Sequence, residues 1–203
     1  MMKRAFGALG LVLILGACAA PPAIPYASDA RVAASAYREP GPATLTVFTM
    51  VNNRSGRGAH TALMINGSQR VIFDHAGSFT NERVPEQDDV LYGVSPAVLA
   101  GYMSAHARAT YHVVRQTVEV TPEQAEIALR LATQNGAVAG GFCTSATTGL
   151  LRQVPGFGDV KSTLFPAQLM AAFAERAGVI EDRYYEDDEG TIVDGVAGIV
   201  IPE

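Results

Sequence analysis

The stretch AHTALMINGSQRVIFDHA, residues 59–76, decides the fold that this sequence predicts. Two strand-like runs flank the dipeptide Asn66-Gly67, which is the strongest short-range signal for a β-hairpin. Another strand is predicted just upstream in TLTVFTMVN, residues 44–52, because this run is rich in β-branched and aromatic residues. The sequence therefore predicts a sheet of antiparallel strands at the start of the domain.

The rest of the chain alternates between helix and strand signals. Helices are expected where a capping residue or a proline precedes apolar residues at helical spacing. The expected helices cover residues 95–107, 121–136, 144–152 and 166–177, and a further strand covers 110–120. The acidic tail that follows predicts a loop with short strands. The fold class predicted is α+β, a small and mostly antiparallel sheet packed against helices.

The first residues predict export. A basic start at Lys3 and Arg4 precedes an apolar run, 5–15, that is too short for a permanent membrane span. The run ends in LGAC, residues 15–18, which resembles a bacterial lipoprotein box. The resemblance implies that residues 1–18 are a signal peptide and that Cys18 carries the lipid. Residues 19–42, rich in Ala and Pro, predict a flexible linker, and residues 43–203 one domain.

Charge and hydropathy limit the partners of the exported chain. Loss of residues 1–17 removes two basic residues and takes the formal charge from −5 to −7, which does not suit nucleic acid. No later apolar run is long enough to cross a bilayer, so the lipid on Cys18 is the expected membrane attachment. Ala19 is not the aspartate associated with inner-membrane retention, which favours an outer-membrane lipoprotein facing the periplasm.

Cys143 is the one cysteine left once Cys18 is lipidated. An unpaired thiol in an oxidising compartment is either buried and inert or kept for its reactivity. The segment GGFCTSATTGLL, residues 140–151, places this thiol at the start of a helix. Free N–H groups and the helix dipole favour a thiolate there and can hold an oxyanion, so the position favours a reactive cysteine.

A base for this thiolate is predicted in the hairpin. His60 begins one strand and His75 ends the other. A loop of two or four residues puts these two histidines on the same face, whereas a three-residue loop pairs His60 with Asp74. We favour His75 as the group that orients His60, because the two commonest loops agree on it. The resulting order of nucleophile, base and orienting group is that of a catalytic triad.

Structural and metal-binding roles are the other interpretations of the histidines and Cys143. Isolated histidines in a fold are usually structural, and His106 and His112 are interpreted in this way. Zinc could be bound by His60, His75 and Cys143, but the chain has no close-spaced pair of His or Cys residues. We therefore predict no metal and no cofactor.

The strand AHTALMI, the strand RVIFDHAGSF and the late helix start GFCTSATTGLL resemble circularly permuted, papain-like cysteine hydrolases of the NlpC type. This group includes relatives of lecithin retinol acyltransferase and several small bacterial lipoproteins. The histidine precedes the cysteine here, which is the permuted order. The resemblance covers roughly residues 44–177 and implies Cys143 as nucleophile, His60 as general base and His75 as the orienting residue. Phe142 and Thr144 depart from the usual neighbours of the cysteine.

The resemblance implies acyl transfer without a cofactor. The function expected is a lipid-anchored envelope hydrolase that cleaves an amide or ester bond, in the first instance in cell-wall peptides. One alternative is a lipid acyl hydrolase or acyltransferase of the same fold, with an apolar and wide cleft. Another is a non-catalytic binding lipoprotein, in which Cys143 is fully buried and far from His60.

Overall fold

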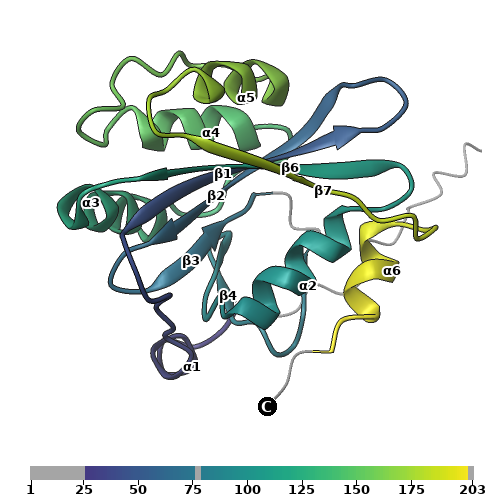
Figure 1. Cartoon of the computed structure of the whole chain (residues 1–203). Coiled ribbons are helices and arrows are strands. Elements are labelled where there is room, and N and C mark those ends of the chain that lie inside the picture. The colour runs from purple at the N-terminus through teal and green to yellow at the C-terminus, as the bar shows by residue number, and fades with distance from the viewer. Residues whose placement is uncertain (1–25, 76–78, 201–203) are drawn as a thin grey trace, which may run out of the picture.

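The computed structural model describes residues 26–75 and 79–200, which form a seven-stranded antiparallel sheet and six helices (Figure 1). The order of the strands is β4-β5-β3-β2-β1-β6-β7, and every pair is antiparallel. The strands are β1 Thr44–Asn52, β2 Gly58–Asn66, β3 Arg70–Phe73, β4 Glu86–Gln87, β5 Val90–Leu91, β6 Tyr111–Glu119 and β7 Ile180–Tyr184. The α+β prediction is confirmed at this level.

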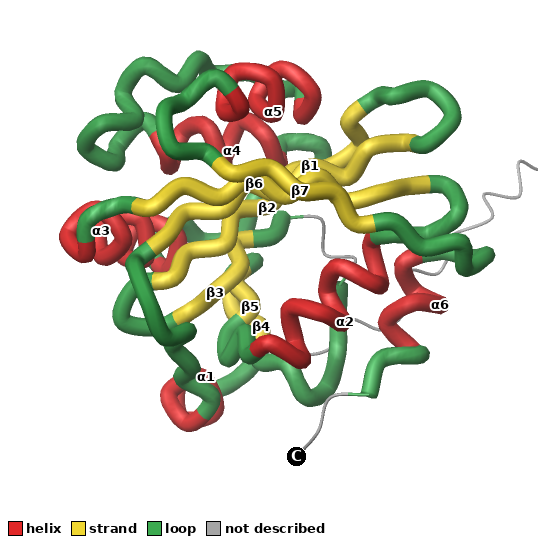
Figure 2. The backbone as a smooth tube through the Cα atoms, viewed as in Figure 1, coloured by secondary structure: helices red, strands yellow, loops and turns green. Residues whose placement is uncertain are grey.

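The helices cover both faces of the sheet (Figure 2). They are α1 Asp29–Ala34, α2 Pro96–His106, α3 Pro122–Thr133, α4 Cys143–Leu151, α5 Pro166–Ala174 and α6 Ile192–Ala197. Helices α3, α4 and α5 pack on the face that carries Val47 and Leu63, whereas α2 and α6 pack on the face that carries Phe48 and Met64. The central strands are therefore buried on both sides, which explains their nearly continuous apolar sequence.

The predicted helix starts are confirmed. Ser95 accepts a hydrogen bond from the N–H of Val98 and caps α2, with Pro96 in the first turn. Thr121 and Gln124 form a reciprocal capping box at the start of α3. These local bonds satisfy N–H groups that a helix leaves unpaired, which is why the sequence alone locates both starts.

The expected register of the β2–β3 hairpin is wrong. The last pair is Asn66 with Arg70, so the turn contains three residues. The three-residue loop considered above would pair His60 with Asp74, and the observed register is shifted from it by two residues. Asn66 is buried, and its amide bonds the backbone of Glu39 and Pro42 instead of shaping a tight turn. Tertiary contacts therefore override the local turn signal, and Asp74 shares the face of His60.

The first described segment differs from the predicted flexible linker. Residues 26–42 contain α1 and lie against the domain. The N–H of Ala27 donates to the carbonyl of Glu86 (2.8 Å), and Arg70 forms an ion pair with Glu39 (2.7 Å). The signal peptide and Cys18 lie outside the described residues. Within the described part of the chain, no helix has the length and apolarity needed to span a membrane.

Candidate active site

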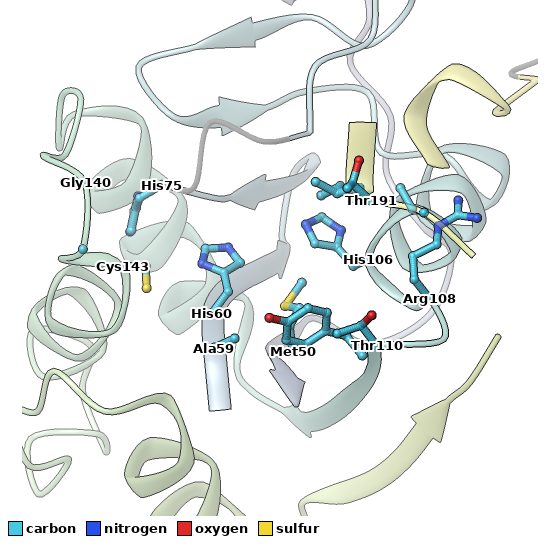
Figure 3. Close-up of a pocket in the computed structure, with 15 residues that line it drawn as sticks. Met50, Ala59, His60, His75, His106, Arg108, Thr110, Gly140, Cys143 and Thr191 are labelled. Carbon is cyan, nitrogen blue, oxygen red and sulfur yellow. The ribbon is translucent and has the colours of Figure 1, made fainter. Parts of the chain in front are cut away.

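The side chains of His60 and Cys143 line one cavity (Figure 3), and Asp74, from a third part of the chain, is bonded to His60. His60 lies near the start of β2, Cys143 is the first residue of α4, and Asp74 directly follows β3. Nε2 of His60 lies 2.7 Å from Oδ1 of Asp74, and the thiol of Cys143 lies close enough to the same imidazole for the two groups to shift each other's pKa. The predicted nucleophile and base are thus adjacent, and the carboxylate of Asp74 fixes the imidazole.

The electrostatics of this group favour a thiolate beside an imidazolium. Burial alone raises the pKa of Cys143, but the hydrogen bond and charge of His60, with the N–H of Thr61, lower it to about 7. Burial lowers the pKa of His60, but the charge and hydrogen bond of Asp74 outweigh this effect and raise it to about 10. Between these values the thiol is ionised while the imidazole keeps its proton, which is the reactive form of a cysteine nucleophile.

The start of α4 positions the thiol. Gly141 has a φ of +86°, which allows the chain to turn directly before the helix. The hydroxyl of Thr144 donates to the hydroxyl of Thr61 (3.3 Å), and this bond docks α4 on β2. The first N–H groups of α4 have no acceptor within the helix, so they are available to hold an oxyanion near Cys143.

Asp74 is held by a second layer of contacts that the sequence reasoning missed. The hydroxyl of Tyr102 donates to Oδ2 of Asp74 (2.8 Å), and the Tyr102 ring is fully buried. His106 bonds the carbonyl of Tyr102 through Nδ1 (2.8 Å) and stacks on His60 with 6.2 Å between ring centroids. His106 also lines the cavity, so it contributes to the site as well as to the fold. The helical spacing of Tyr102 and His106 was visible in the sequence, but the packing of α2 was not.

His75 does not orient His60. Its buried ring packs edge-on against Phe73, and Nδ1 lies 3.8 Å from Oδ2 of Asp89. Among the described residues, neither ring nitrogen of His75 has a hydrogen-bond partner. The reason is the register of the hairpin, which points Asp74 toward His60 and His75 away from Nε2.

The cavity beside Cys143 has a volume of about 570 Å³. Its walls come from β1, β2, α2, the glycines that precede α4 and the segment before α6. Most of the side chains that line it are apolar or small. They include Met50, Ala59, Ala105 and Ile192. The cavity therefore surrounds the Cys143–His60 pair with mainly apolar and small residues, and the guanidinium of Arg108 is a further charged group in its lining.

Comparison of the chain with protein-family models, curated proteins and solved structures found no match. The resemblance drawn from the motifs stays a prediction, and the functional argument rests on the site itself. Within residues 26–75 and 79–200, no group of three or more His, Cys, Asp or Glu side chains is arranged to hold a metal ion.

The buried histidines predict a loss of stability in acid. Burial lowers the pKa of His75 and of His106 from 6.5 to about 4. The unfolded chain therefore binds more protons than the folded protein between these values, so stability falls as pH falls through this window. Chemical unfolding at pH 7 and pH 5 should show a loss on the order of 2 kcal/mol for each histidine.

His75→Asn isolates this effect, because asparagine does not titrate. His60 has the opposite effect on the pH dependence of folding stability. Because its pKa is raised in the folded protein, the stability that it contributes is fully present below pH 6.5 and is lost as pH rises toward 10. The variant should lose less stability than the wild type between pH 7 and 5, by on the order of 2 kcal/mol. An equal loss in both proteins would contradict the assignment.

Proposed function

We propose that this protein is a cysteine hydrolase that cleaves an amide or ester bond by acyl transfer. The proposal rests on one observation, the contact chain Cys143–His60–Asp74 at the wall of a cavity. In this arrangement Cys143 is the nucleophile, His60 is the base and acid, and Asp74 orients His60.

The steps follow from the positions of these groups. The thiolate of Cys143 attacks the carbonyl carbon of the substrate, and the N–H groups at the start of α4 hold the oxyanion that forms. His60, which carries a proton in the resting pair, gives it to the departing amine or alcohol, leaving a thioester on Cys143. His60 then takes a proton from water as the water attacks the thioester, and the acid product leaves.

We propose the permuted papain-like fold and a lipid anchor at Cys18 for the same chain. The order of the site residues supports this fold, since His60 precedes Cys143. The short apolar run and LGAC motif support export and anchoring at the bacterial envelope, in the outer membrane facing the periplasm. Cell-wall peptides are the proposed substrates, because they lie beside such a protein and contain amide bonds.

A lipid acyl group is the second candidate substrate, and the apolar walls of the cavity favour it. The non-catalytic alternative requires a fully buried thiol far from His60. Cys143 is only partly buried, and it lies close enough to His60 for this histidine to lower the pKa of the thiol, which argues against that alternative.

The test measures how fast iodoacetamide alkylates Cys143 as a function of pH. The full chain carrying Cys18→Ser has Cys143 as its one cysteine, so the signal is unambiguous. We expect an apparent pKa of about 7 for Cys143. Adding His60→Ala should raise this pKa toward that of an ordinary thiol, about 8.5, and slow alkylation at pH 6 by about tenfold or more.

His112→Ala is the matched control, because its ring bonds Asn53 and lies away from the cavity lining. It should leave the alkylation profile of Cys143 unchanged. If Cys143 titrates like an ordinary thiol and its pKa does not depend on His60, the hydrolase proposal is wrong.

A further inference from the structure

Asp89 connects the two parts of the chain that carry the orienting carboxylate and the nucleophile. Its carbonyl accepts a hydrogen bond from the N–H of Asp74 (2.8 Å), and its Oδ2 accepts one from the N–H of Val138 (2.6 Å). The same Oδ2 lies 3.8 Å from Nδ1 of His75. The residue is mostly buried, so these contacts are shielded from water.

The loop before Cys143 depends on this contact. It runs from Gly136 to Phe142 and contains Gly140 and Gly141, so its backbone is intrinsically free to adopt many conformations. Among the described residues, the bond from Val138 to Asp89 is the single hydrogen bond from this loop to a distant part of the domain, because its other bonds lie within the loop or join it to the adjacent Asn135 and to α4. Gly140 in this loop and Cys143 both line the cavity (Figure 3).

The backbone of Asp89 is held in a conformation that few residues adopt. Gln87 pairs with Val90, and the two residues between them, Asp88 and Asp89, have φ values of 49° and 63°. This is the geometry of a two-residue type I′ turn, which favours glycine or asparagine. The turn points the carboxylate of Asp89 at the N–H of Val138. Glycine would suit the backbone but could not accept this hydrogen bond.

We propose that Asp89 is a positioning residue of the site: its carboxylate holds the loop that leads to Cys143, while its backbone carbonyl holds the strand end that carries Asp74. The inference rests on the proposed function. Asp89 does not touch the reacting atoms. It acts by holding the thiol at the place where His60 can pair with it, since small displacements of a reacting group cost large factors in rate.

The experiment uses the full chain with Cys18→Ser and measures alkylation of Cys143 by iodoacetamide from pH 6 to 9. Asp89→Gly removes the carboxylate and suits the positive φ, and Asp88→Gly makes the same change one residue away. We expect Asp89→Gly to react about tenfold more slowly at pH 7, with Asp88→Gly within about twofold of the parent. Asp89→Asn should restore most of the rate, because its amide oxygen can still accept from Val138.

A double variant separates positioning from a general loss of structure. In the His60→Ala background the thiol has no partner to be placed against, so Asp89→Gly should change the rate little. An effect of the same size in both backgrounds would overturn the proposal. So would equal rates for Asp89→Gly and Asp88→Gly, or a rate loss that merely follows a loss of folded protein in thermal unfolding.

The proposed function and this inference fail in different ways. If the parent thiol titrates normally and ignores His60, the hydrolase proposal is wrong, and this inference falls with it. If the parent thiol is activated by His60 but Asp89→Gly leaves it unchanged, the inference alone is wrong.

Discussion

Replacing Cys143 with alanine is expected to abolish acyl transfer while leaving the fold intact. With p-nitrophenyl acetate as an activated acyl donor, the Cys18→Ser chain should release a rapid burst of about one p-nitrophenol per protein and gain one acetyl group on Cys143. Cys143→Ala should lose both, with a rate lower by at least about 10³-fold. Alanine suits the first turn of α4, so the thermal unfolding midpoint should change little.

Ser145→Ala is the control for the helix start. Its hydroxyl donates to the carbonyl of Phe142 in the same turn as Cys143, but it is not part of the cavity lining. This variant should keep the burst. A burst of equal size in Cys143→Ala would mean that another group takes the acetyl, and the assignment of the nucleophile would be wrong.

Asp74→Asn is expected to reduce acyl transfer by about 10²-fold. The charge of Asp74 is what raises the pKa of His60 against the effect of burial. An asparagine removes that charge, so the imidazolium is less stable and the apparent pKa of Cys143 rises above about 7. The measurement is the pH dependence of the burst rate, which should shift to higher pH in the variant.

His75→Asn is the matched change at the neighbouring position. Because His75 makes no hydrogen bond to His60 among the described residues, we expect an effect of at most about threefold. The opposite ranking, with His75→Asn far worse than Asp74→Asn, would restore the sequence-based assignment and contradict the observed register.

The sequence predicts well what is decided locally. The strand β1 and the helices α2 and α3 begin where capping residues and β-branched runs place them, because these signals need no distant partner. The position of Cys143 at the start of α4 is also decided locally, since Gly140 and Gly141 lie just upstream of the capping residue Phe142. The pairing of this thiol with His60 was expected from chemistry and is consistent with the structure.

What the sequence did not predict depends on contacts between distant segments. The Asn66-Gly67 signal favoured the wrong register because Asn66 bonds to residues of the first described segment and Ser68 bonds to Glu126 on α3. No local rule reports such contacts. The same limit explains why Tyr102 and Asp89 were missed, since each acts through an element that becomes a neighbour only in the fold.

The packing of residues 26–42 against the domain shortens the free linker between Cys18 and the domain in the proposed lipoprotein. Eight residues separate Cys18 from Ala27, the first described residue with a hydrogen bond to the domain, and a fully extended chain of that length reaches about 30 Å. A free linker up to Pro42 would span about 85 Å. Ala27 bonds Glu86, three residues before the Asp89 that holds the loop leading to Cys143, so the chain from the proposed anchor meets the domain beside that turn. If Cys18 carries a lipid as proposed, this docking would keep the domain within about 30 Å of the bilayer surface.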